Sequence, residues 1–274
     1  MIKEERKRLK KREQIQVVVR CILITIIIIC LVAVGIHLMK EKEADRVYEN
    51  MQAESVVITA DIEGAEKIEG KREWENVPEV DFETLWETNM DICAWIYVPG
   101  TQVNYPILRN NQAVDPYDDY YLQHTVDKKE GLPGAIYMEP CNMPDFSDKN
   151  TVLYGHHMKN GSMFASLDSY LNADFFEENA YVYIVTPEKN LVYQIFGAVI
   201  YDNRHIMRSY DFSDDVSYQL FLDSLVANES QADIIREDVE VTVQDRMITM
   251  STCVKNQDDK RLLVEAVLVD EYER

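Results

Sequence analysis

The sequence predicts a mostly β fold: a closed or nearly closed barrel of about eight strands, with one helix before it and one between its sixth and seventh strands. From about residue 92 onward, short apolar or alternating runs are separated by Gly, Pro, Asn or Asp, which is typical of barrels built from short strands. After residue 77 only two segments carry apolar residues at helical spacing. An uncharged run, residues 21–39, precedes the domain and predicts one transmembrane helix.

The first 39 residues have the charge pattern of a membrane anchor. Residues 1–20 contain eight Lys or Arg and three Glu, whereas residues 21–39 contain none of these. A run of this length can cross a bilayer, and the positive-inside rule keeps its basic side in the cytoplasm. We therefore expect a single-pass cell-membrane protein whose remaining chain is extracellular. Cleavage as a signal peptide near residues 33–35 is the alternative, although the apolar run is longer than a usual signal-peptide core.

The rest of the chain is expected to form a charged stalk and one folded domain. Residues 40–77 are rich in charge and poor in large apolar side chains, which predicts a solvated segment that is at most partly helical. Residues 78–274 are long enough for a single core. Of the 28 basic and 49 acidic residues, 20 and 46 lie beyond residue 39, a formal charge of −26. This charge excludes nucleic acid as a partner.

The elements of the folded domain follow from local patterns. A first helix begins after Asp81, which can cap it, and a second begins after Ser213. Apolar side chains at helical spacing support both: Phe82, Leu85 and Trp86 in the first, and Tyr218, Leu222 and Leu225 in the second. Strands are expected in residues 93–100, 102–108, 134–138, 151–156, 180–187, 191–201, 239–244, 248–253 and 262–269.

Five cysteines, at positions 21, 30, 93, 141 and 253, do not form a pattern typical of disulfides or metal sites. Two lie in the expected anchor, and the other three are an odd number at wide spacings. Neither Cys-x-x-Cys nor His-x-x-x-His occurs, so we expect no metal and no cofactor. An unpaired thiol outside the cell is better explained by reactivity than by a structural role.

The segment "ITMSTCVKNQDDKRLLVEAVLV", residues 248–269, predicts two strands joined by a polar turn. The first strand ends at Cys253, "KNQDDK" (residues 255–260) forms the turn, and the second strand begins at Arg261. On these residues alone, a hairpin with a small buried cysteine stays an open interpretation, because free cysteine is often buried. A nucleophilic Cys253 would need a base or ion-pair partner and a donor for an oxyanion.

A histidine pair follows another predicted strand, in "NTVLYGHHMKNGSMFASL" (residues 150–167). That strand ends at Gly155, and His156 comes next, at the kind of strand rim where catalytic side chains are displayed. Taken alone, His156 and His157 are equally well explained as ordinary loop histidines. Arg261, eight residues after Cys253, is in isolation a surface strand residue.

Together these segments resemble the sortases, cysteine transpeptidases whose signature strand end is Thr-Leu-x-Thr-Cys. Here "TMSTC" has Met250 in place of the leucine, a volume-conserving change, and Arg261 follows eight residues after the cysteine. "YGHHMKNGSMF", the helix before "WIYVPGTQVNYPIL" and the helix between the sixth and seventh strands resemble class B sortases in particular. The resemblance covers nearly all of residues 80–270 and implies a sortase-type β-barrel.

The resemblance also implies roles for individual residues. Cys253 would attack the carbonyl after the threonine of a sorting signal, and His156 would protonate the departing amine and later deprotonate the incoming one. Arg261 would hydrogen-bond the substrate backbone or the oxyanion. Three further residues would line the groove for the substrate: Tyr154, Ser251 and Thr252. The resemblance gives no role to His157.

The implied function is that of a membrane-anchored transpeptidase with an extracellular catalytic domain, residues 78–274. Its expected partners are surface proteins with a C-terminal sorting signal, of the Asn-Pro-x-Thr type, and an amine acceptor. The acceptor is a peptidoglycan precursor or cross-bridge amine, or a pilin lysine. Two alternatives stay open: an exported cysteine peptidase that only hydrolyses, and a non-catalytic, membrane-tethered adhesion or pilus-assembly module.

Overall fold

The computed structural model describes residues 2–57, 77–227, 230 and 232–274. The chain divides into two units, Met1–Arg46 and Val47–Arg274, and all described strands belong to the second. Helix α1 (Ile2–Ser55) forms the first unit and continues into the second. Among the described residues, no helix is both long enough and apolar enough to cross a membrane. The transmembrane anchor expected at residues 21–39 gains no support from this finding and stays a prediction.

The second unit begins earlier than the sequence suggested. Residues 40–55, expected to be at most partly helical, belong to α1, whereas residues 58–76 of the expected stalk lie outside the described residues. Tyr48 and Met51 are 3% and 6% exposed and belong to the main hydrophobic core. The structure therefore places the boundary between Arg46 and Val47 rather than at residue 78.

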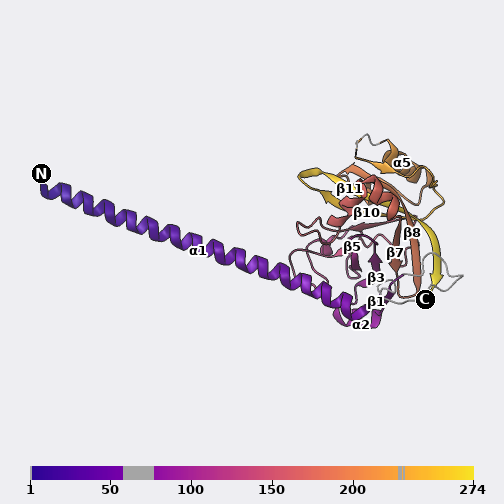
Figure 1. The fold of residues 1–274 in the computed structure, drawn as a ribbon, viewed down its shortest axis with the longest axis horizontal. Helices are drawn as coiled ribbons and strands as arrows, with labels where there is room; N and C mark the ends of the chain where they lie inside the picture. The colour runs from indigo at the N-terminus through magenta and orange to yellow at the C-terminus, as the bar shows by residue number, and fades with distance from the viewer. Residues whose placement is uncertain (1, 58–76, 228–229, 231) are drawn as a thin grey trace. The chain divides into compact units, whose positions relative to one another are not determined.

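Eight strands of the second unit close into a barrel (Figure 1). The order around the sheet is β11-β10-β6-β5-β4-β3-β7-β8, and β8 pairs back to β11. This confirms the predicted mostly β, closed barrel. The strands are β3 (Ile92–Tyr97), β4 (Asn104–Arg109), β5 (Ile136–Met138), β6 (Asn150–Tyr154), β7 (Tyr181–Val185), β8 (Lys189–Asp202), β10 (Met247–Val254) and β11 (Gln257–Glu273).

Both predicted helices are present. Helix α2 (Phe82–Thr88) is capped by Asp81, whose side chain accepts a hydrogen bond from the Thr84 N–H. Helix α5 (Asp215–Val226) lies between β8 and β10, the sixth and seventh barrel strands. Its cap is Asp214 rather than Ser213, because the Ser213 hydroxyl donates to Asp211 instead. The shorter elements are β1 (Val56–Val57), β2 (Glu79–Val80), η2 (Tyr120–Leu122), η3 (Ala165–Leu171), α3 (Ala173–Glu178), α4 (Ile206–Ser209) and β9 (Ile234–Ile235).

The strand predicted at residues 239–244 is wrong. The chain turns there, and the N–H and hydroxyl of Thr242 both donate to the Asp245 carboxylate at 2.8 Å. Val239, Val241 and Val243 pack against an outer hydrophobic cluster without a strand partner. A short strand forms earlier instead, where β9 pairs with Gly197 and Ala198 of β8. The alternating valines therefore mark a segment that is buried on one side, but this segment does not join the sheet.

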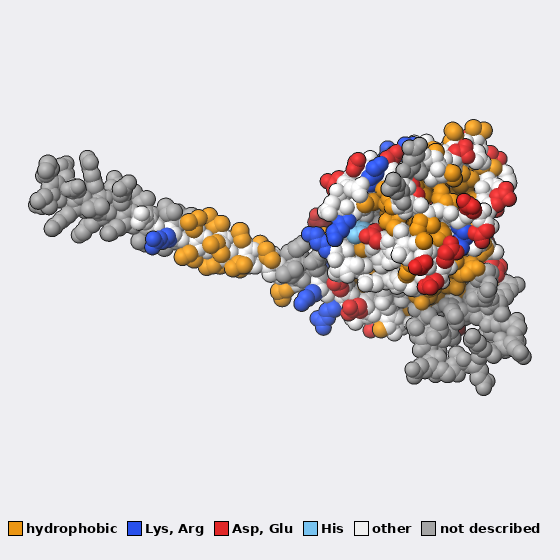
Figure 2. Space-filling model, turned by 45° about the horizontal axis from the view of Figure 1, so that its top comes forward, with side chains coloured by type: hydrophobic (Ala, Val, Ile, Leu, Met, Phe, Trp, Pro, Cys, Tyr) orange, Lys and Arg blue, Asp and Glu red, His pale blue; other side chains and the backbone are white. Residues whose placement is uncertain are grey.

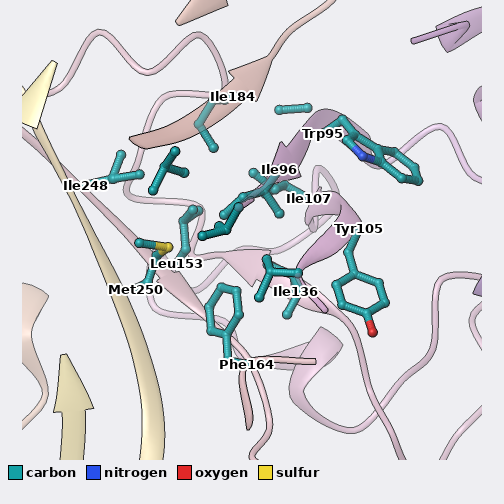
Figure 3. Close-up of a cluster of buried hydrophobic side chains, with 14 of the residues drawn as sticks. Trp95, Ile96, Tyr105, Ile107, Ile136, Leu153, Phe164, Ile184, Ile248 and Met250 are labelled. Atoms are coloured by element: carbon teal, nitrogen blue, oxygen red, sulfur yellow. The ribbon is translucent and has the colours of Figure 1, made fainter. Parts of the chain in front are cut away.

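The two faces of the barrel wall have separate hydrophobic clusters. The interior holds Ile96, Ile107, Leu153, Phe164, Ile248 and Met250 (Figure 3). The outer cluster lies under α5 and includes Met247, Leu263, Val267, Phe221 and Leu222. Along β10, the even-numbered residues Ile248 and Met250 face inward, as the two-residue period of a strand requires. Acidic side chains are scattered over the visible surface of this unit (Figure 2), in keeping with its formal charge.

One carboxyl group is fully buried on the outer side of the barrel wall. Glu265 of β11 is 0% exposed, and its Oε2 accepts a hydrogen bond from Thr249 Oγ1 at 2.7 Å. Its Oε1 has no hydrogen-bond partner among the described residues. Burial raises the pKa of Glu265 from 4.5 to about 8, because a carboxylate loses its hydration there.

We therefore expect the Glu265 carboxyl to make the protein less stable as pH rises. The folded state binds more protons than the unfolded state between pH 4.5 and 8, so the free energy of unfolding falls as pH increases through this range. Glu265→Gln keeps the acceptor for Thr249 and removes the charge. At pH 8 it should raise the free energy of unfolding by on the order of a few kcal/mol, with little change at pH 4.5.

Chemical denaturation at both pH values measures this effect. Glu271→Gln is the matched control, because Lys189 and Arg246 lower the pKa of Glu271, so its neutralisation should destabilise the protein at pH 8. A Glu265→Gln protein that is no more stable than the wild type at pH 8 would contradict the assignment.

Candidate active site

Cys253 and Arg261 lie directly opposite each other on neighbouring strands. In the β10–β11 ladder, Cys253 pairs with Arg261, and the next pair is Val254 with Gln257. The chain reverses over Lys255 and Asn256 alone. The expected six-residue turn is therefore wrong, because residues 257–260 already belong to β11. Residues 258–260 form a bulge between the Val254–Gln257 and Cys253–Arg261 pairs. This bulge is what brings an arginine eight residues along the chain level with the cysteine.

The Arg261 side chain closes this bulge. Its Nη1 donates to the carbonyl of Asp258 at 3.1 Å and to that of Lys260 at 2.8 Å. Arginine has five donors in a planar fork, so the guanidinium can fix the bulge and still donate to a bound group. Both Arg261 and the exposed Cys253 line one pocket of about 520 Å³.

His156 reaches the same pocket from β6. β6 runs parallel to β10, with Tyr154 level with Ser251, and the Gly155 N–H donates to the Ser251 carbonyl at 3.2 Å. A Cβ at Gly155 would lie 2.5 Å from the Ile136 side chain and 2.7 Å from the Phe164 side chain, so only glycine fits there unless those side chains move. His156 then follows, and it lines the same pocket as Cys253 and Arg261.

The hydrogen bond of His156 fixes its tautomer. Its Nε2 lies 2.7 Å from the carbonyl oxygen of Leu122. A carbonyl only accepts, so Nε2 carries the hydrogen and Nδ1 is the ring atom left to exchange a proton. His157 lies differently: its Nε2 contacts the Asp168 carboxylate at 2.7 Å, and it does not line this pocket.

The three residues expected along the groove also line this pocket. Tyr154 is partly exposed and stacks on Tyr137 at 5.3 Å between ring centroids. Ser251 and Thr252 are 6% and 2% exposed. Because successive strand residues point to opposite faces, Thr252 turns its side chain to the side opposite that of Ser251 and Cys253. The Thr252 hydroxyl is buried and has no hydrogen-bond partner among the described residues.

A second wall of the pocket was not predicted from the sequence. Glu139, just after β5, is 2% exposed, and its Oε1 lies 2.8 Å from Nε2 of His205, the residue before α4. The Tyr154 hydroxyl donates to Glu139 Oε2 at 3.4 Å. On the same wall, the Arg208 guanidinium lies 4.3 Å from the ring centroid of Tyr117.

Burial governs the proton of the Glu139–His205 pair. It raises the pKa of Glu139 to about 7, and burial together with Arg208 lowers the pKa of His205. Both shifts favour a neutral carboxyl–imidazole hydrogen bond over an ion pair. The sequence offers little sign of this pair. Glu139 is a carboxyl at the end of a strand, before a proline, and His205 is one of four histidines beyond the expected anchor.

Comparison with known proteins agrees with this arrangement. The sortase-domain family model matches residues 96–269. This chain belongs to the sortase family. Sortase B of Staphylococcus aureus is 33% identical over 190 residues, which cover 69% of this chain and 74% of that protein.

Solved structures of sortase B also match this chain. A Staphylococcus aureus sortase B–substrate complex matches with a TM-score of 0.59 and 32% identity, covering 69% of this chain and 84% of that chain. Bacillus anthracis sortase B in complex with AAEK1 matches with a TM-score of 0.63 and 29% identity, covering 85% and 99%. The sortase is therefore a class B sortase and a cysteine transpeptidase.

The environments of the cysteines in the folded unit distinguish them chemically. Burial raises the pKa of Cys93 to about 12, and burial together with Glu139 raises the pKa of Cys141 to about 12. Cys253 is exposed. Since the thiolate is the reactive form, a thiol with a pKa near 12 has roughly 1,000-fold less reactive thiolate at pH 8 than an ordinary thiol.

We therefore expect a thiol-reactive probe at pH 8 to label Cys253 first among these three. Mass spectrometry of proteolytic peptides from the folded full-length sortase resolves each cysteine and separates them from Cys21 and Cys30. Denatured protein provides the control, in which all five should react. Labelling of Cys141 as fast as Cys253 in the folded state would contradict the assignment.

Proposed function

We propose that the sortase cleaves a sorting signal after its threonine through a Cys253 thioester and then transfers the surface protein to an amine. The observation that carries this proposal is the convergence of Cys253, His156 and Arg261 on one pocket from three neighbouring strands, β10, β6 and β11. The substrate complex of the Staphylococcus aureus relative supports a sorting-signal substrate of the same kind.

Each step assigns a proton to a named atom. The Cys253 thiol first gives its proton to His156 Nδ1, and the resulting thiolate attacks the carbonyl carbon of the threonine. Donors that include the Arg261 guanidinium stabilise the oxyanion that forms. His156 Nδ1 donates a proton to the departing amine, which breaks the peptide bond and leaves a thioester. The incoming amine attacks this thioester, His156 Nδ1 takes the amine proton, and the Cys253 thiolate leaves.

The acceptor is proposed to be an amine of a peptidoglycan precursor or cross-bridge, with a pilin lysine as the second candidate. An exported peptidase would use the same thioester but resolve it with water. A non-catalytic adhesion or assembly module would form no thioester. The fate of the thioester therefore separates these three functions.

The test is product analysis on an Asn-Pro-x-Thr peptide with and without triglycine as the amine. We expect a new threonyl–glycine product that depends on triglycine. Cys253→Ala should abolish cleavage and thioester alike, and His156→Ala should lower kcat/KM by roughly 10²–10⁴-fold. His157→Ala is the matched control, because its partner is Asp168, and it should cost far less. Hydrolysis alone at saturating triglycine would favour the peptidase.

We also propose that the N-terminal segment anchors the sortase in the cell membrane with residues 1–20 in the cytoplasm. The support is the eight basic residues that precede the uncharged run at residues 21–39. A protease added to intact cells should release a fragment containing Cys253 and leave the N-terminus protected. A mature protein that begins near Ile36 would contradict the proposal.

A further inference from the structure

The last turns of α1 are held inside the folded unit by a buried hydroxyl. Tyr48 is 3% exposed, and its hydroxyl donates to the carbonyl of Gly134 at 2.6 Å and accepts from the N–H of Val126 at 3.1 Å. Burial raises the pKa of Tyr48, so the hydroxyl keeps its proton and can donate and accept at once. One side chain of α1 thus satisfies two buried backbone groups of the segment between η2 and β5.

That segment folds back on itself around Leu122. The Gly131 N–H donates to the Gln123 carbonyl at 2.8 Å, and the Ala135 N–H donates to the Tyr121 carbonyl at 2.9 Å. Gly134, at φ +65°, packs directly on Leu122: a Cβ there would lie 2.5 Å from the Leu122 carbonyl oxygen. The position of Gly134 therefore limits where that oxygen can lie.

The Leu122 carbonyl is the group that holds the His156 ring. It accepts from His156 Nε2 at 2.7 Å and thereby sets which ring nitrogen carries the hydrogen. A continuous series of contacts thus runs from the Tyr48 hydroxyl to Gly134, from Gly134 to the Leu122 carbonyl, and from there to His156. Each step is a hydrogen bond or a backbone contact among residues buried in the unit or lining its pocket.

We propose that Tyr48 is a positioning residue, which fixes the tautomer and orientation of His156 through Gly134 and the Leu122 carbonyl. The end of α1 is then part of the catalytic machinery rather than a spacer. The effect on rate rests on the proposed role of His156, whereas the effect on its tautomer does not.

The first test compares Tyr48→Phe with Tyr170→Phe in the full-length protein. Tyr170→Phe is the matched control, because it removes a buried hydroxyl that has no partner among the described residues. Tyr48→Phe should lower kcat by roughly 10- to 100-fold at nearly constant KM, once the rate is normalised to folded protein. Tyr170→Phe should stay within about twofold of the wild type.

The deciding readout is the ¹⁵N spectrum of histidine-labelled protein, with the His156 ring assigned by His156→Ala. In the wild type this ring should show one tautomer with the hydrogen on Nε2, and in Tyr48→Phe the two ring nitrogen shifts should converge. An unchanged tautomer in Tyr48→Phe would overturn the positioning role. A changed tautomer at unchanged kcat would uphold the positioning but contradict the proposed role of His156.

A second pair of variants tests the link between Gly134 and Leu122. Gly134→Ala places a methyl group against the Leu122 carbonyl, whereas Gly131→Ala strains the same loop at φ +131° with no atom within 4 Å of the new Cβ. We expect the tautomer change and the loss of kcat in Gly134→Ala and not in Gly131→Ala. Equal spectra for these two variants would overturn the proposed path.

Discussion

The register of β10 is the constraint on which the active site depends. β10 pairs with β6 on one side and with β11 on the other, and these two ladders place Tyr154 beside Ser251 and Arg261 opposite Cys253. A slip by one residue would turn the thiol toward the barrel interior, because side chains alternate across a strand. Ile248 and Met250 in the interior core make such a slip costly. The packing of the barrel thus sets the position of the Cys253 thiol.

The histidines near the site differ in the partner that holds each ring. His157 contacts the Asp168 carboxylate and His205 the buried Glu139 carboxyl, whereas the hydrogen-bond partner of His156 among the described residues is the neutral carbonyl of Leu122. A backbone carbonyl orients the ring without adding a charge beside it. The role proposed for His156, to give a proton in one half-reaction and take one back in the next, is better served by a neutral partner.

Local patterns predicted the barrel strands and both helices, whereas the resemblance to the sortases implied Cys253, His156 and Arg261, which the structure brings to one pocket. Local patterns failed where contacts between residues far apart in the sequence determine the structure. Asp258 and Asp259 look like loop residues, yet they belong to β11 because the bulge opposite Cys253 accommodates them. Glu139 and His205 are unremarkable in sequence, and only the fold brings them together across 66 residues. Tyr48 lies among charged residues in the sequence, which gave no sign of burial. Segments much later in the chain, which include Val126 and Gly134, cover it in the fold.

The position of Tyr48 changes how the chain around residue 47 should be understood. A solvated stalk would only connect two parts of the chain, and substitutions in it would not affect the active site. Here a residue of that segment satisfies the Val126 N–H and the Gly134 carbonyl, two backbone groups buried in the unit. Removal of the Tyr48 hydroxyl leaves both groups without a hydrogen bond, which costs on the order of 1–3 kcal/mol for each. The segment that carries both groups is destabilised as a result. The same segment that carries those groups carries the Leu122 carbonyl, so stability and catalysis are coupled at the end of α1.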